Sequence, residues 1–201
     1  MIHQNRKLDQ PGGRAVHEGE GRDSWLPPAA TAMGLGMLTY AIDYKEELQR
    51  LGPAGFQRAY FQPVLVTLGM AGEINPTASG DGTSVVNLDG GTFACTRLTG
   101  RVFPVVKPQN SIRGPISVGR TSENDIAIPE YSVSKRHCSI ARVEGEYRLT
   151  DMGSTNGTIV DGMPLLPQKP RRLKGGETIS LGRLMLVFYF AEGFVRHLQA
   201  L

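Results

Sequence analysis

The stretch "VSKRHCSI" (residues 133–140) leads from polar residues into an alternating pattern that predicts a β-strand. Ser134 and His137 are three residues apart, which is compatible with a nucleophile and its base, whereas Lys135 and Arg136 suit the binding of an anion. A plain loop ahead of a strand would also explain these four residues without any function. The rest of the chain has to distinguish these three interpretations.

On both sides of this stretch, apolar and polar residues alternate with the period of half-buried β-strands. Ile116 and Val118 share one face of a predicted strand, and Ile126 and Ile128 share one face of another. Glu-Gly and Asp-Gly pairs, which are typical of hairpin turns, separate later strands. Short strands at this spacing indicate an all-β sandwich of about ten or eleven strands over residues 96–192.

The N-terminal half of the chain has a different composition. Residues 1–32 mix Gly, Pro and charges without a period, which predicts a disordered tail. Residues 33–64 are predicted to be helical, with a Gly-Pro pair as a break between two pieces. Residues 65–95 are dense in Gly, Asn, Asp, Ser and Thr, which favours a linker or long loop. Residues 193–201 are expected to be a C-terminal tail.

Charge and cysteine content limit the function classes. The 201 residues carry a net charge of +3. Clustered basic runs interleaved with aromatics are missing, so we expect no nucleic-acid partner. Cys95 and Cys138 have no metal-binding spacing and fit a reducing cytoplasm, with Cys138 as a small buried hydrophobe. Because no apolar run of about 18 residues occurs, we expect a cytoplasmic protein with no membrane partner. We also expect no cofactor.

Three polar stretches interrupt the alternation of the predicted sandwich. They are "GRTSEND" with Gly119-Arg120, "EYSVSKRH" with Ser134 to His137, and "DMGSTNGT" with Ser154 to Gly157. Loops on a rigid β scaffold commonly carry binding residues. Taken together and in this order, the stretches resemble the forkhead-associated (FHA) domain, whose signature is Gly-Arg, then Ser-x-x-His, then Ser-x-Asn-Gly. The resemblance covers about residues 96–192 and implies an FHA-like β-sandwich.

The resemblance also implies a site for phosphothreonine, which carries about −1.5 to −2 charges and three acceptor oxygens. Arg120 is expected to bind the phosphate through its planar guanidinium, and Ser134 to donate a neutral hydrogen bond. Lys135 and Thr155 are expected to add phosphate contacts. Asn156 is expected to contact the peptide backbone beside the phosphothreonine.

Three further residues are expected to support the site rather than bind the ligand. His137 is expected to connect two loops by hydrogen bonds, Gly157 to supply the positive φ of a turn, and Gly119 to complete the Gly-Arg element. Ser132 matches a position that helps to select the peptide in the family, and as a short neutral residue it predicts no strong charge preference.

Structural explanations exist for some of the same residues. Arg120 taken alone could be a surface cation paired with Glu123 or Asp125, and Arg136 is best explained as a solvated charge. Ser134 could simply bond local backbone at the start of a strand. The three stretches occurring together favour the binding site over these explanations.

The sequence therefore predicts an adaptor that binds threonine-phosphorylated proteins, the substrates of a Ser/Thr protein kinase. The alternative is a phosphate-independent docking or assembly module. An enzyme is not expected, because Ser134 and His137 lack a recognisable orienting acid and oxyanion site, and residues 1–95 lack a P-loop or a Rossmann fingerprint. The threonines of the predicted linker could also bind the domain of another chain once phosphorylated; they are Thr77, Thr83 and Thr92.

Overall fold

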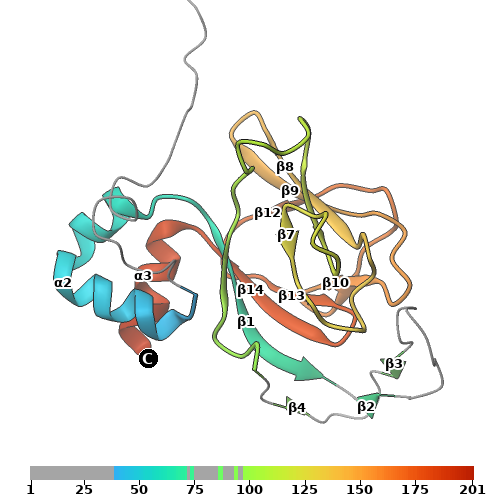
Figure 1. The fold of residues 1–201 in the computed structure, drawn as a ribbon, viewed down its shortest axis with the longest axis horizontal. Coiled ribbons are helices and arrows are strands. Elements are labelled where there is room, and N and C mark those ends of the chain that lie inside the picture. Colours follow the sequence, from blue (N-terminus) through green and yellow to red (C-terminus); the bar gives the residue numbers. More distant parts are fainter. Residues whose placement is uncertain (1–38, 72, 75–85, 88–92, 95–96) are drawn as a thin grey trace, which may run out of the picture.

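The computed structural model describes residues 39–71, 73–74, 86–87, 93–94 and 97–201 (Figure 1). The predicted tail over residues 1–32 lies outside this part of the chain. The helices are α2 (Ala41–Ala59) and α3 (Ala191–Ala200). The strands are β1 (Val64–Ala71), β2 (Glu73–Ile74), β3 (Val86–Asn87), β4 (Phe93–Ala94), β5 (Val102–Pro104), β6 (Ile116–Gly119), β7 (Ile126–Ala127), β8 (Cys138–Val143), β9 (Glu146–Asp151), β10 (Thr158–Val160), β11 (Met163–Pro164), β12 (Arg171–Leu173), β13 (Thr178–Leu181) and β14 (Leu184–Tyr189).

Two sheets make up the sandwich. The seven-stranded sheet has the order β11-β10-β13-β14-β1-β4, with β5 also paired to β1, and the five-stranded sheet has the order β12-β9-β8-β6-β7. Strands β6 and β7 are parallel, whereas β8 and β9 form an antiparallel hairpin through a turn at Glu144-Gly145. The predicted all-β sandwich is confirmed.

The inner faces of the sheets bury one continuous apolar core. Alternate residues supply it, as the period of two predicted: Val118 of β6, Ile140 of β8, Leu149 of β9 and Leu186 and Phe188 of β14 are each at most 1% exposed. Cys138 belongs to this core as predicted, and burial raises the pKa of its thiol. Burying a large apolar side chain stabilises the fold by about 1.5–3 kcal/mol, so this core holds the loops at its edge in place.

Strand β1 differs from the prediction of a linker over residues 65–95. It lies between β14 on one side and the edge strands β4 and β5 on the other. Leu65 points into the sandwich core, while Val64 and Val66 belong to a second apolar cluster on the outer face. Because both faces of β1 are covered, its sequence lacks the alternation of a half-buried strand.

The second apolar cluster joins the helices to the outer face of the seven-stranded sheet. Phe56 of α2 and Phe194 of α3 are buried there beside Tyr44, whose ring centroid is 5.3 Å from that of Phe194. The predicted break is present, since Gly52 has a φ of 67° and Pro53 follows it. The helical segment is shorter than predicted, because α2 ends at Ala59 and β1 begins at Val64.

The C-terminus also differs from the prediction. Residues 193–201, expected to be a tail, lie almost entirely in α3, which packs against α2 (Figure 1). Phe194, Val195 and Leu198 form its buried face. A helix of this length is marginal alone and depends on such packing, which explains why the local sequence did not predict it. Among the described residues, no helix is both long and apolar enough to cross a bilayer.

Candidate functional site

The three polar loops of the sequence prediction meet at one end of the sandwich. The backbone N–H of Arg120, after β6, donates to the carbonyl oxygen of Ser134 at 2.9 Å. The backbone N–H of Thr155, after β9, donates to Ser134 Oγ at 2.9 Å. Asn156 Nδ2 donates to the carbonyl oxygen of Ser132 at 2.8 Å. Arg120 and Asn156 are 36 positions apart in sequence. These hydrogen bonds hold both residues close to the segment that carries Ser132 and Ser134.

Gly119 allows the first two loops to approach each other closely. A Cβ atom at this position would lie 2.3 Å from the carbonyl oxygen of Lys135 and 2.8 Å from Asn124 Nδ2. Asn124 Nδ2 itself donates to that carbonyl oxygen at 2.7 Å. The space beside Gly119 is thus filled by backbone, and only glycine fits there.

His137 connects the second and third loops. Its Nδ1 accepts the backbone N–H of Ser134 at 3.0 Å, so the ring proton must be on Nε2, which donates to the carbonyl oxygen of Gly157 at 3.1 Å. The side chain is fully buried. Both ring nitrogens are engaged by backbone, so the arrangement is not that of a base beside a nucleophilic Ser134.

We expect His137 to make the domain less stable below about pH 6.5. Burial lowers the pKa of His137 in the folded protein below the value of 6.5 of an unfolded histidine. Above pH 6.5 the ring is neutral in both the folded and the unfolded chain, so His137 does not reduce the free energy of unfolding there. As the pH falls through that value, the unfolded chain gains a proton that the folded chain resists, and the free energy of unfolding decreases. The charged ring would also lose its bond from the Ser134 N–H.

Urea unfolding at about pH 7.5 and about pH 5.5 measures this effect. The decrease in unfolding free energy between the two values should be smaller in His137→Gln than in the parent chain. Burial also lowers the pKa of His197, which would add its own pH dependence. Both proteins therefore carry His197→Gln to remove that contribution. An equal decrease in the two proteins would contradict the prediction.

The turn that carries Thr155 and Asn156 is organised by Asp151. Its carboxylate accepts the backbone N–H groups of Gly153 and Ser154 at 2.8 and 2.9 Å, and the hydroxyl of Thr158 at 2.5 Å. Burial alone would raise the pKa of Asp151, but these hydrogen bonds and that of the Ser154 hydroxyl outweigh it and hold the pKa below its ordinary value. The sequence analysis did not identify Asp151 as part of the site.

Arg120 lies over an exposed aromatic ring. Its guanidinium carbon is 5.7 Å from the ring centroid of Tyr131, and Tyr131 is 66% exposed. The structural alternative paired Arg120 with Glu123 or Asp125. The carboxylate of Asp125 is instead held by Lys107 at 2.6 Å and by the backbone N–H of Ser117 at 2.7 Å.

Tyr131 was missed by the sequence analysis, although an aromatic residue in a polar loop is a usable signal. We expect Tyr131→Ala to weaken binding of an anionic peptide by about two- to fivefold, the equivalent of an exposed cation–π contact of about 0.5–1 kcal/mol. Tyr131→Phe keeps the ring and should bind like the wild type. Fluorescence anisotropy measures both, and equal loss in the two variants would contradict this role of the ring.

Ser132, which matches a position that helps to select the peptide in the family, is buried in this structure. It is 1% exposed, its backbone N–H donates to Glu130 Oε2 at 2.8 Å, and its hydroxyl accepts the backbone N–H of Arg183 at 2.9 Å. Ser132 therefore positions the loop. Lys135, by contrast, has an exposed side chain, and its carbonyl oxygen is the group that accepts from Asn124.

Comparison with known families accounts for this arrangement. A family model described as the FHA domain matches residues 116–182, which run from β6 to the turn after β13 and include all three loops. Residues 116–182 are an FHA domain. The resemblance of the sequence motifs is thereby confirmed, and the FHA domain of this chain is joined by β1, β5 and β14 to the helices α2 and α3.

Curated relatives extend the comparison. The ABC transporter ATP-binding/permease protein Rv1747 of Mycobacterium tuberculosis is 30% identical over 175 residues, which are 85% of this chain and 18% of that protein. The oxoglutarate dehydrogenase inhibitor of Corynebacterium efficiens is 38% identical over 72 residues, which are 36% of this chain and 49% of the relative. The chain thus spans about half or less of the length of these relatives.

Among solved structures, the chain is similar to the FhaA FHA domain complexed with the intracellular domain of Rv3910. The sequences are 23% identical, the TM-score is 0.40, and the match covers 63% of this chain and 98% of that chain.

Proposed function

We propose that this chain is an adaptor that binds threonine-phosphorylated segments of partner proteins, which are substrates of a Ser/Thr protein kinase. The observation that carries the proposal is the convergence of the three loops on Ser134. It supports a shared site because the backbone of Arg120 bonds to Ser134, the hydroxyls of Ser134 and Thr155 are adjacent, and Lys135 follows Ser134 in the chain.

These groups match the chemistry of a phosphate monoester. The hydroxyls of Ser134 and Thr155 are 3.3 Å apart, so one phosphate oxygen can contact both. Arg120 supplies a planar, permanently charged donor, and Lys135 adds a second positive charge. We propose that Asn156 contacts the peptide backbone beside the phosphothreonine. Gly119, His137 and Gly157 support the loops and do not contact the ligand.

The expected affinity is moderate. Hydrogen bonds to a charged group contribute about 1.5–3 kcal/mol each, and the ordering of a flexible peptide subtracts from their sum. A dissociation constant on the order of micromolar follows.

An adaptor rather than an enzyme fits the site. Among the described residues, no group of three or more His, Cys, Asp and Glu side chains could hold a metal ion, and both ring nitrogens of His137 contact backbone. Two relatives have names that describe regulators: an oxoglutarate dehydrogenase inhibitor and the glycogen accumulation regulator GarA of Mycolicibacterium smegmatis. We therefore propose a non-catalytic regulatory role in the cytoplasm, where protein kinases modify its partners.

The test is a fluorescence titration with degenerate peptide libraries that carry phosphothreonine, phosphoserine or unmodified threonine at one fixed position. Micromolar binding of the phosphothreonine library alone is the expected result. Equal binding of the phosphorylated and unmodified libraries would sink the proposal and favour a phosphate-independent docking module.

A further inference from the structure

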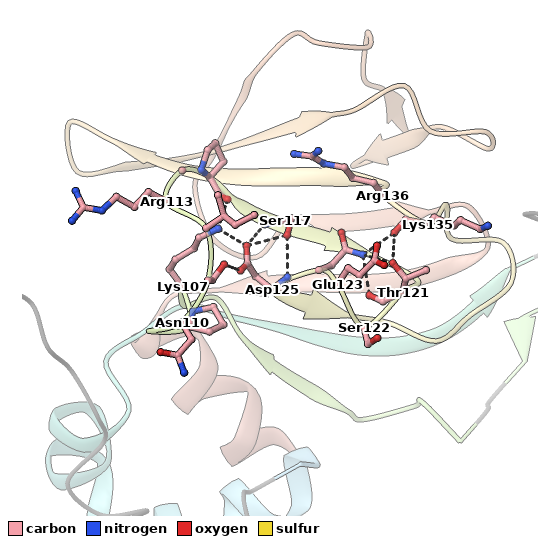
Figure 2. A pocket seen from close by; sticks show the side chains of 16 residues that line it. Lys107, Asn110, Arg113, Ser117, Thr121, Ser122, Glu123, Asp125, Lys135 and Arg136 are labelled. Carbon is pink, nitrogen blue, oxygen red and sulfur yellow. Dashed lines mark hydrogen bonds and ion pairs between the residues drawn. The ribbon is translucent and has the colours of Figure 1, made fainter.

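A second polar hollow lies beside the loops of the proposed phosphate site. It has a volume of about 700 Å³ and is lined by the segment between β5 and β6, by the loop after β6, and by Lys135 and Arg136 before β8 (Figure 2). Lys135 belongs both to this lining and to the proposed phosphate site, and the lining residue Thr121 directly follows Arg120 in the chain. An extended peptide advances about 3.3–3.6 Å per residue, so a segment bound at the phosphate site can reach this pocket within a few residues.

Two arginines give the pocket its charge. Arg113 and Arg136 both line it and are both exposed. Among the described residues, neither forms an ion pair. In Figure 2 the side chain of Arg136 extends toward the loop that carries Arg113, whereas that of Lys135 extends in the opposite direction and that of Arg113 extends outward, away from Arg136. Lys135 and Arg136 are consecutive in sequence, but their side chains therefore reach different parts of the surface.

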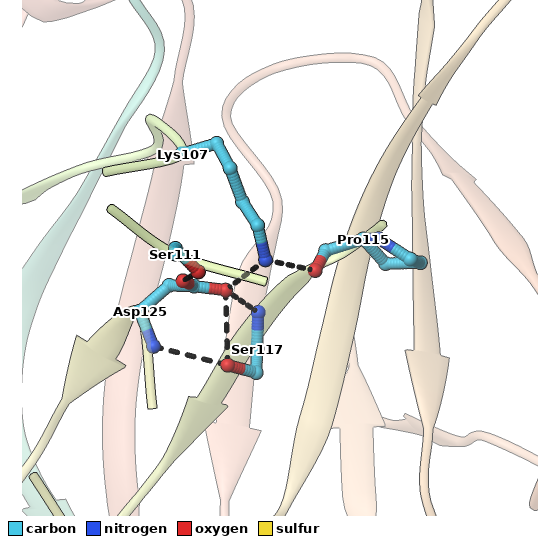
Figure 3. A network of polar contacts seen from close by, with 5 residues as sticks. All are labelled: Lys107, Ser111, Pro115, Ser117 and Asp125. Atoms are coloured by element: carbon cyan, nitrogen blue, oxygen red, sulfur yellow. Dashed lines mark hydrogen bonds and ion pairs between the residues drawn. The ribbon is translucent and has the colours of Figure 1, made fainter. Parts of the chain in front are cut away.

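The carboxylates of the pocket do not cancel this charge. Asp125 accepts from Lys107 Nζ at 2.6 Å, from the backbone N–H of Ser117 at 2.7 Å and from the hydroxyl of Ser111 (Figure 3). Burial alone would raise the pKa of Asp125, but these bonds lower it to about 2, so the Lys107–Asp125 pair stays ionised and neutral overall. Glu123 is the other acidic side chain of the lining, set against the two arginines Arg113 and Arg136.

The walls of the pocket are fixed before any ligand arrives. Lys107 Nζ also donates to the carbonyl oxygen of Pro115 at 2.9 Å (Figure 3). The hydrogen bonds of Lys107, Ser111 and Pro115 therefore hold the irregular segment between β5 and β6 in place. On the other side, Asn124 Nδ2 donates to the carbonyl oxygens of Thr121 and Lys135 at 2.9 and 2.7 Å. A cationic pocket with fixed walls loses little entropy when it binds an anion.

We propose that Arg136, with Arg113 at the outer edge of the pocket, forms a second anion site that binds an acidic side chain or a second phosphate on the same peptide. The inference rests on the proposed phosphothreonine function and adds to it the charge preference that Ser132 does not supply. Arg136 is then a specificity residue and not merely a solvated charge.

The experiment uses an alanine-rich host peptide with one central phosphothreonine. A single glutamate or phosphoserine is moved through the positions within about four residues on either side, and fluorescence anisotropy gives each affinity. We expect a gain of about fivefold for glutamate at one or two positions on one side only, the equivalent of an exposed ion pair of about 1 kcal/mol. Phosphoserine should give a larger gain there because it carries more charge.

Variants separate the pocket from general charge effects. Arg136→Glu should convert the gain into a loss, and Arg113→Ala should reduce it. Arg196→Glu makes the same change of net charge on α3, where Arg196 is 67% exposed and paired with Glu192, and should keep the gain. Raising the ionic strength should reduce the gain, because both arginines are exposed.

The outcomes distinguish this inference from the function on which it rests. If the host peptide binds through Arg120 but no position prefers an anion, or the preference survives in Arg136→Glu, the second site is refuted and the phosphothreonine function stands. If no phosphorylated peptide binds the wild type, both proposals fail.

Discussion

Arg120→Ala is expected to lower the affinity for a phosphothreonine peptide by about a hundredfold or more. A bidentate guanidinium–phosphate contact consists of two hydrogen bonds to a charged group, each contributing about 1.5–3 kcal/mol. Arg120 is also the residue that Tyr131 and the loop around Ser134 hold in place. Isothermal titration calorimetry with matched phosphorylated and unmodified peptides measures the loss.

Two variants control for this result. Arg120→Lys keeps the charge but not the planar pair of donors, so its affinity should lie between those of the wild type and Arg120→Ala. Arg142 lies over Tyr147 at 5.8 Å, in nearly the same geometry as Arg120 over Tyr131 at 5.7 Å, but on the β8–β9 hairpin. Arg142→Ala should bind like the wild type. Phosphopeptide binding that survives in Arg120→Ala would remove the basis of the proposed function.

Gly119→Ala is expected to lower the free energy of unfolding by about 1–3 kcal/mol, the usual cost of overpacking, and to abolish phosphopeptide binding. The added Cβ would meet the carbonyl oxygen of Lys135 at 2.3 Å and its carbonyl carbon at 2.9 Å. Because both are backbone atoms, the loops must separate, and the hydrogen bond from the Arg120 N–H to Ser134 is lost.

The same substitution in α3 is a matched control. A Cβ on Gly193 would meet the Tyr189 ring at 3.4 Å, an ordinary contact, and Ala is favoured over Gly in a helix by about 0.5–1 kcal/mol. Urea unfolding should therefore show stabilisation in Gly193→Ala and destabilisation in Gly119→Ala. If Gly119→Ala were as stable as the wild type, the close approach of the two loops would not depend on a glycine at this position.

The motifs in the loops could be predicted from the sequence because their chemistry is local. The spacing of Ser134 and His137 lets the imidazole accept the backbone N–H of Ser134 within one turn of chain, and Gly157 follows Asn156 where a positive φ of 74° is needed. The period of two likewise predicted strands such as β6, whose Ile116 and Val118 both pack in the sandwich core, since alternation depends only on neighbouring residues.

Other features depended on parts of the chain that are distant in sequence. Strand β1 is covered by the sandwich on one face and by the helices on the other, so its apolar run has no alternation. The helix α3 is stable only where Phe194 meets α2. For α3 the partner surface on α2 lies more than 100 residues away, and β1 depends in the same way on β14 and α3, which no local pattern contains.

The same distinction applies within the site. The sequence by itself determined which loops carry the binding residues, because Gly-Arg, Ser-x-x-His and Ser-x-Asn-Gly are local patterns. Only the tertiary structure decided that Ser132 is buried, that Tyr131 lies under Arg120, and that Arg136 faces a separate pocket. The direction of a side chain in a loop is set by the packing of that loop against others, and this packing forms only when the two sheets have folded.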